Sequence, residues 1–224
     1  MPDAISLGPL SISGLVLSAA LSGAAGLLIL YVWVKQAAAI RSGPWLELAA
    51  VAVPIVVLCW KFGILWRDPS LLWERPGLVL LMTGGGVEAA AGCVLALIYW
   101  FLAARKRKLS PWLAADALAI AIAGGIGVWC LLSAPAYRWG YAIVCAAVLY
   151  RLFRQRDGDR QAFGGAAIAF CYGIGAGTLA VSLFLPPPPF APPIEWLGLP
   201  ERQWLMIGTG LLGVLLQAGK ERTG

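Results

Sequence analysis

Two ionisable side chains lie inside long apolar stretches of the sequence, Lys61 and Glu88. A lone charge at the centre of a lipid bilayer costs at least about 2.5–3.5 kcal/mol, so such groups face the interior of a helix bundle, form a pair or become neutral. Glu88 is therefore an ion-pair partner of Lys61, a protonated carboxyl group, or the lining of a polar cavity for a lipid head group or a proton. The sequence leaves these three interpretations open. It makes Lys61 and Glu88 the two candidates for a catalytic role.

Composition excludes most other kinds of reactive site. The sequence contains no histidine and no asparagine, so a serine–histidine pair and the usual acyl-transfer triad are impossible. The glycines at 124–127 lie inside an apolar stretch and follow no strand, so they form no phosphate-binding loop. The cysteines are scattered through apolar stretches without a CxxC pair, as small hydrophobic residues would be; they are Cys59, Cys93, Cys130, Cys145 and Cys171. We expect no metal site and no cofactor.

The elements that position these residues are predicted to be membrane-spanning helices. Of the 224 residues, 60% are hydrophobic and 12% are charged, and the mean hydropathy is +0.81. A soluble domain carries about twice that charged fraction, and a helix crosses a bilayer in roughly 20 residues. The sequence predicts an all-α, polytopic integral membrane protein with one domain over residues 1–224. We predict seven spans, at about 10–34, 45–66, 77–103, 112–133, 138–153, 162–185 and 203–218.

Basic residues are distributed unevenly between the predicted loops. Twelve lysines and arginines fall in the loops on one side, among them residues 105–108, Arg151 and Arg154, and four fall on the other side. Loops rich in lysine and arginine stay in the cytoplasm, so the N-terminus is predicted outside and the C-terminus inside. This topology also accounts for the net charge of +6, and we expect no nucleic-acid partner.

Tryptophans mark the predicted span limits. The indole ring prefers the boundary of the acyl chains, with its N–H in reach of water. Seven tryptophans are expected to be interfacial anchors of this kind; they are Trp33, Trp45, Trp66, Trp100, Trp112, Trp139 and Trp204.

Seven short segments form a recognisable series along the chain. They are ISLGPLSI at 5–12, CWKFGIL at 59–65, ERPGLVLLMTGGGVEAAAG at 74–92, ARKRKLSPWLAADALA at 104–119, GGIGVW at 124–129, FCYGIG at 170–175 and GLPERQW at 198–204. In order, spacing and topology the series resembles the bacterial prolipoprotein diacylglyceryl transferases. Those enzymes cross the inner membrane seven times and move diacylglycerol from phosphatidylglycerol to the lipobox cysteine of a prolipoprotein. The resemblance implies a multi-pass protein of the bacterial cytoplasmic membrane.

The chain departs from that family at the reactive positions. Lys61 stands where the family has an arginine, the family's histidine falls on Ala90, and the arginine and asparagine of its signature fall on Gly125 and Val128. No realignment restores these elements, because histidine and asparagine are absent from the whole chain. Losing one preorganised group of this kind costs about 10²–10³ in rate. We therefore expect a retained cavity that has lost its chemistry, in which Glu88 is the partner of Lys61.

The resulting hypothesis is a catalytically inactive relative that binds a membrane phospholipid such as phosphatidylglycerol, a lipoprotein signal helix or another membrane protein. Lys61, Tyr137 and Arg138 are the expected contacts to a lipid head group. Glycines are expected to line the cavity with their backbone; they are Gly85, Gly86, Gly92, Gly124, Gly125 and Gly127. Two alternatives stay open: an active transferase with a rebuilt site, and a pathway for a small solute or a proton through Glu88.

Overall fold

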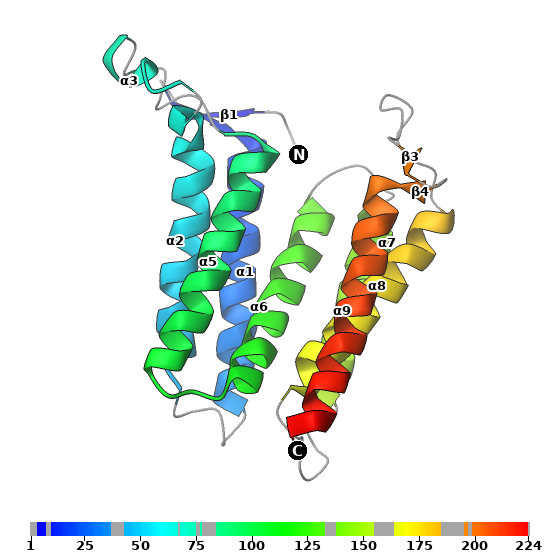
Figure 1. The fold of residues 1–224 in the computed structure, drawn as a ribbon. Coiled ribbons are helices and arrows are strands. Elements are labelled where there is room, and N and C mark those ends of the chain that lie inside the picture. The colour runs from blue at the N-terminus through cyan, green and yellow to red at the C-terminus, as the bar shows by residue number, and fades with distance from the viewer. Residues whose placement is uncertain are drawn as a thin grey trace. The chain divides into compact units, whose positions relative to one another are not determined.

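The computed structural model of the chain describes residues 4–7, 10–36, 43–66, 68–74, 77, 84–132, 138–154, 164–184, 195–196 and 199–223. Long helices dominate these ranges (Figure 1). Their bounds are α1 Gly14–Gln36, α2 Trp45–Phe62, α5 Gly86–Lys106, α6 Pro111–Leu132, α7 Arg138–Arg154, α8 Gly165–Phe184 and α9 Glu201–Thr223. The 3-10 turn η1, Gly63–Trp66, and the short helix α3, Leu71–Glu74, follow α2. The prediction of a helical protein is confirmed.

Two small β-hairpins were not predicted. Strands β1 (Ala4–Leu7) and β2 (Leu10–Ser13) pair antiparallel, with Ile5 opposite Ile12, and β2 leads directly into α1. Strands β3 (Glu195–Trp196) and β4 (Leu199–Pro200) pair in the same way before α9. Each strand has at most four residues, so the hairpins add little to a fold built from helices.

Five helices in the described ranges are long and apolar enough to cross a membrane. They are Val16–Gln36, Trp45–Trp66, Gly86–Lys106, Pro111–Leu132 and Gly165–Phe184. The chain also forms helices at the other two predicted spans, but α7 has 17 residues and α9 carries charges at both ends. The predictions of seven crossings and of the outside N-terminus therefore stay predictions.

The third predicted span requires a correction. Residues 84 and 85 are not helical, and α5 begins at Gly86 instead of residue 77 and continues to Lys106. The physical reason is the run of three glycines at 84–86, because glycine is the least favourable residue in a helix interior apart from proline. At the other end the helix is closed by Lys108, whose φ is 56°.

The chain divides into two compact units. Unit 1 comprises Met1–Arg41 and Ala115–Gly224, and unit 2 comprises Ser42–Ala114. In unit 2, α2 and α5 lie side by side (Figure 1). Gly92 permits this contact, because a Cβ atom at that position would lie 2.8 Å from the Cβ of Cys59 and 3.0 Å from the carbonyl oxygen of Val56. Small residues allow helix backbones to approach closely in this way.

Two of the predicted interfacial tryptophans form the core of unit 2. Trp45 is 0% exposed and Trp100 is 1% exposed, and their ring centroids are 6.4 Å apart. The indole N–H of Trp100 donates a hydrogen bond to the carbonyl oxygen of Ala114 at 3.0 Å, which satisfies the polar end of the ring. Trp33 in α1 is also buried. These three side chains are core residues and not anchors. Trp66, Trp139 and Trp204 are exposed, as anchors would be.

Glycine also sets the helix contacts of unit 1. A Cβ at Gly26 of α1 would lie 2.6 Å from the carbonyl oxygen of Ala121 in α6, and a Cβ at Gly175 of α8 would lie 2.7 Å from the backbone nitrogen of Gly210 in α9. Ser18 and Ser22 lie on α1, buried, and donate their hydroxyl hydrogens to the carbonyl oxygens four residues earlier. These serines thus satisfy their polar groups inside their own helix.

One buried carboxylate joins α6 to the beginning of α8. The Asp116 oxygens accept hydrogen bonds from the backbone N–H of Gly164 at 2.7 Å and of Ala167 at 2.8 Å. Asp116 is 6% exposed. The first N–H groups of a helix have no partner within the helix, and a carboxylate beside them is favoured by the helix dipole. Asp116 therefore acts as the N-terminal cap of α8 from another helix.

We expect Asp116→Ala to lower the free energy of unfolding by roughly 2 kcal/mol, because the N–H groups of Gly164, just before α8, and of Ala167, in its first turn, lose a charged acceptor. Asp116→Asn keeps one carbonyl oxygen as acceptor and should lie between the wild type and the alanine variant. Thermal unfolding of the purified protein in detergent measures the order of the three. Equal midpoints would show that the cap adds no stability.

Candidate functional site

Glu88 lies in the first turn of α5. Its Oε2 accepts a hydrogen bond from the backbone N–H of Gly85 at 2.7 Å, and the residue is 5% exposed. A glutamate at the third helical position that reaches back to the residue before the helix is half of a capping box. Glu88 therefore lies near the start of its helix and not well inside it, as the span predicted over 77–103 implied, because α5 starts two residues before it.

Glycines on the facing segments make room for the Glu88 side chain. A Cβ atom at Gly63 would overlap the Glu88 Cγ, and a Cβ at Gly84 would lie 2.9 Å from the Glu88 Cβ. The backbone N–H of Gly84 donates to the carbonyl oxygen of Trp60 at 2.8 Å, which fixes the chain before α5 against the end of α2. Glu88 is thus enclosed between α5, the residues before it and η1.

Lys61 lies half-buried in the last turn of α2, next to Trp60 and two residues before Gly63. Lys61 and Glu88 therefore stand at the same end of the α2–α5 pair. Their ion pair stays a prediction. The role that the structure itself gives to Glu88 is to cap α5.

The glycines expected to line a cavity lie mainly in helix contacts. In unit 1, a Cβ at Gly124 would contact the side chain of Ile29, and a Cβ at Gly125 would lie 3.3 Å from the backbone carbonyl oxygen of Ser22. A Cβ at Gly127 would lie 3.2 Å from the Cβ of Cys145. In unit 2, Gly92 contacts α2 and Gly85 precedes α5, whereas a Cβ at Gly86 would meet nothing within 4 Å. Their role at a cavity stays a prediction.

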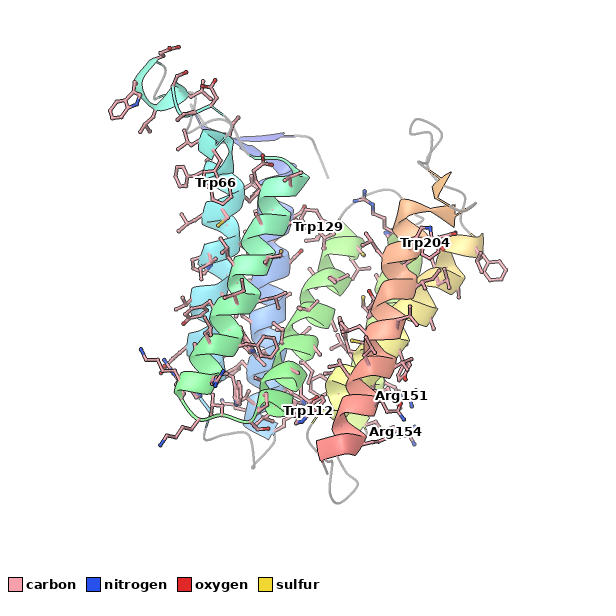
Figure 2. The ribbon with its side chains drawn as sticks, viewed as in Figure 1. Trp66, Trp112, Trp129, Arg151, Arg154 and Trp204 are labelled. Carbon is pink, nitrogen blue, oxygen red and sulfur yellow. The ribbon has the colours of Figure 1, made fainter. Side chains whose placement is uncertain are left out.

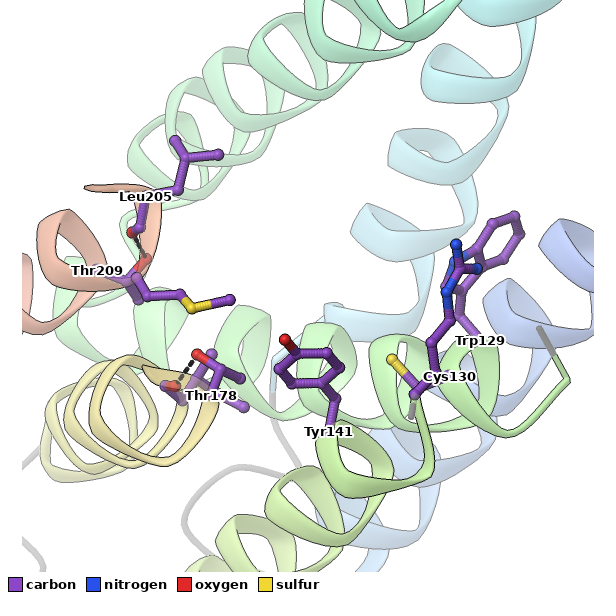
Figure 3. Close-up of a pocket in the computed structure, with 9 residues that line it drawn as sticks. Trp129, Cys130, Tyr141, Thr178, Leu205 and Thr209 are labelled. Atoms are coloured by element: carbon purple, nitrogen blue, oxygen red, sulfur yellow. Dashed lines mark hydrogen bonds between the residues drawn. The ribbon is translucent and has the colours of Figure 1, made fainter. Parts of the chain in front are cut away.

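A pocket of about 310 Å³ lies within unit 1 (Figure 3). Four helices supply its walls, at the end where α6 and α8 finish and α7 and α9 begin. The lining residues are Trp129 and Cys130 from α6, Arg138 and Tyr141 from α7, Ile174 and Thr178 from α8, and Leu205, Met206 and Thr209 from α9. Arg138, one of the expected head-group contacts, is among them, whereas Tyr137 lies outside the described residues.

The polar groups of this pocket differ in what they offer a ligand. The Thr178 hydroxyl donates to the Ile174 carbonyl oxygen at 2.5 Å, and the Thr209 hydroxyl donates to the Leu205 carbonyl oxygen at 2.8 Å. Because each hydroxyl gives its hydrogen to its own helix, both threonines present oxygen lone pairs as acceptors. Arg138 supplies positive charge and N–H donors, and Tyr141 supplies a hydroxyl group. The rest of the lining is mostly apolar.

The ends of unit 1 differ in character. Trp129 and Trp204 lie at the pocket end, and Arg151 and Arg154 lie at the opposite end of the unit (Figure 2). Tryptophan is enriched at membrane interfaces, and arginine is enriched on the cytoplasmic side. The pocket therefore opens near one predicted membrane interface, away from the basic end of α7.

Sequence reasoning identified Arg138 but missed most of the pocket. Arg138 and Tyr141 are three residues apart, and Ile174 and Thr178 are four apart, so each pair shares one face of its helix. This spacing is a usable signal, but no sequence pattern brings α6, α7, α8 and α9 to one place. Asp116 was also missed, although a lone aspartate in an apolar helix indicates a buried partner.

We expect Gly63→Ala to lower the free energy of unfolding by about 1–3 kcal/mol, because the added methyl group overlaps the Glu88 side chain. Gly86→Ala is the matched control, since a Cβ at that position meets nothing within 4 Å. Thermal unfolding of the two variants in the same detergent compares them. Equal loss of stability in both would contradict the assigned contact.

Comparison with known proteins shows a distant similarity to a bacterial enzyme. The chain is 28% identical over 134 residues to the phosphatidylglycerol–prolipoprotein diacylglyceryl transferase of Bacillus velezensis. The match covers 57% of this chain and 48% of the relative, so the chain matches about half the length of that enzyme. No family model matches the chain. The five helices that are long and apolar enough to cross a membrane indicate a multi-pass membrane protein, and the similarity to the transferase is weak and partial.

Proposed function

We propose that this protein binds an anionic phospholipid of the bacterial cytoplasmic membrane by its head group, in the pocket of unit 1, without transferring it. The observation that carries the proposal is one arginine, Arg138, among largely apolar pocket walls. A phospholipid has the same combination of properties, because a charged phosphate is joined to apolar chains. Phosphatidylglycerol is the candidate lipid, since the Bacillus relative is named for it.

The chemistry of the lining matches such a head group. The Arg138 guanidinium can donate to phosphate oxygens through parallel N–H groups. Thr178 and Thr209 offer acceptors, which suit the hydroxyl groups of a glycerol head group. A volume of about 310 Å³ is at the lower end for ligand pockets, so it accommodates the polar part of a lipid while the acyl chains stay in the bilayer.

The composition supports binding in preference to transfer. Transfer to a thiol requires help in forming the thiolate and stabilisation of the phosphate leaving group. The chain has no histidine for proton transfer, and the Glu88 carboxylate is occupied as the cap of α5. With the topology predicted from the basic residues, the pocket faces the outer half of the membrane. There it could hold a lipid for a lipoprotein precursor or another membrane protein.

We expect Arg138→Gln to weaken binding of phosphatidylglycerol about tenfold or more, because a hydrogen bond to a charged group contributes about 1.5–3 kcal/mol. Arg151→Gln is the matched control, since Arg151 is exposed on the same helix away from the pocket. The measurement is equilibrium binding of phosphatidylglycerol with a fluorescent acyl chain, and phosphatidylethanolamine is the comparison lipid. Equal affinities of the two variants would refute the site.

The similarity to the Bacillus enzyme favours one alternative, an active transferase with a rebuilt site at Lys61. Expression in cells depleted of their own diacylglyceryl transferase tests it, with lipid attachment to a reporter prolipoprotein followed by gel shift. Our proposal predicts no attachment from well-expressed, membrane-inserted protein. Restored attachment that is lost in Lys61→Ala would establish the transferase instead.

A further inference from the structure

The segment after α2 exposes an unusual amount of apolar surface for a chain that has just left a membrane span. Trp66 of η1 is 68% exposed, Leu72 of α3 is 45% exposed and Trp73 of α3 is 81% exposed. We call these three side chains the aromatic patch. Large exposed apolar patches mark interaction sites, and tryptophan at such a site contributes a large apolar ring with a polar N–H.

The aromatic patch is continuous with a surface that faces lipid. Helix α2 belongs to a candidate membrane span that ends at Trp66, and apart from Glu47 in its first turn its exposed side chains are apolar; they include Val57, Leu58 and Phe62. Figure 2 shows Trp66 projecting outward from the end of this helix. The patch therefore begins at the level where the span meets the head groups, which is the depth that tryptophan prefers.

The backbone of the segment is able to enter that boundary. Unsatisfied N–H and C=O groups are costly away from water. Most of the described N–H groups have acceptors within the segment or in η1: Asp68 donates to the Ile64 oxygen at 3.1 Å, Trp73 to the Ser70 oxygen at 3.0 Å and Glu74 to the Ser70 oxygen at 3.0 Å. The N–H of Ser70 donates to the Asp68 carboxylate at 3.2 Å.

The charges of the segment are compatible with this placement. Asp68 and Glu74 are exposed and lie on either side of the apolar Leu72 and Trp73, and the sequence places one positive charge, Arg67, next to Asp68. The carboxylates can stay in the aqueous layer while the rings enter the acyl boundary, as in helices that lie in a membrane interface. Arg67 and the two carboxylates give the segment a net charge of −1 and therefore no net attraction to anionic head groups, so the binding energy comes from the apolar side chains.

We infer that Trp66 and residues 68–74 form an interfacial foot, which lies on the membrane surface with Trp66, Leu72 and Trp73 inserted among the lipids. Its partner is the bilayer that α2 itself crosses. This placement does not depend on the proposed lipid pocket, because all of its residues belong to unit 2.

The test places an environment-sensitive fluorophore on a cysteine at position 73 or at position 68, in a variant whose five native cysteines are replaced, in phospholipid nanodiscs. We expect the label in Trp73→Cys to be quenched by lipids that carry a shallow spin label and protected from aqueous iodide. The label in Asp68→Cys should show the reverse. Iodide quenching at both positions would place the foot in water. Protection from both quenchers at position 73 would indicate a protein contact, and either result overturns the inference.

A second measurement keeps the native cysteines. Tryptophan fluorescence of the wild type and of Trp73→Phe is recorded in nanodiscs with and without brominated lipid. The difference in emission between the two proteins is the contribution of Trp73, and we expect brominated lipid to quench this contribution. If this contribution is insensitive to brominated lipid, Trp73 does not contact the bilayer.

Discussion

The close approach of helix backbones at glycine is the constraint on which both units depend. In a bilayer the lipid tails are as apolar as leucine, so helices associate through tight packing and not through burial from water. At Gly26, Gly92 and Gly175 a single added carbon atom would overlap the facing helix. These contacts decide which faces of the helices meet, and so which residues remain to line the pocket of unit 1.

Buried carboxylates have a related role at the helix ends. Glu88 accepts an N–H at the start of α5, and Asp116 accepts two at the start of α8. Both are acidic residues in apolar surroundings, where a sequence analysis looks first for catalysis. Both carboxylates instead accept hydrogen bonds from backbone N–H groups at the start of a helix, where these groups have no acceptor within the helix. A carboxylate inside a membrane protein is thus a candidate for capping as much as for chemistry.

The position of the helices could be predicted from the sequence, because long apolar runs in a bilayer have few alternatives to the helix. The start of α5 could not be predicted in this way. The apolar pattern continues through residues 77–103, but the three glycines and the capping by Glu88 make the helix begin at Gly86. Burial was the weakest inference: Trp45 and Trp100 were expected at the interface, but they face each other inside unit 2. The pocket could not be predicted, because it depends on the packing of four helices against one another, and the spacing of residues within one helix carries no information on that packing.

In the turn after α5, the backbone conformation and the charge of Lys108 favour different residue types at the same position. Lys108 has a φ of 56°, a left-handed conformation that costs an ordinary residue roughly 1–2 kcal/mol and that glycine adopts freely. The shape of the turn is held from inside by the bond between Trp100 and the Ala114 carbonyl. The lysine is therefore not the residue that backbone geometry would select here. It is the fourth consecutive cation after a candidate membrane span, and the predicted topology, which places this loop in the cytoplasm, favours positive charge at a position where backbone geometry favours glycine.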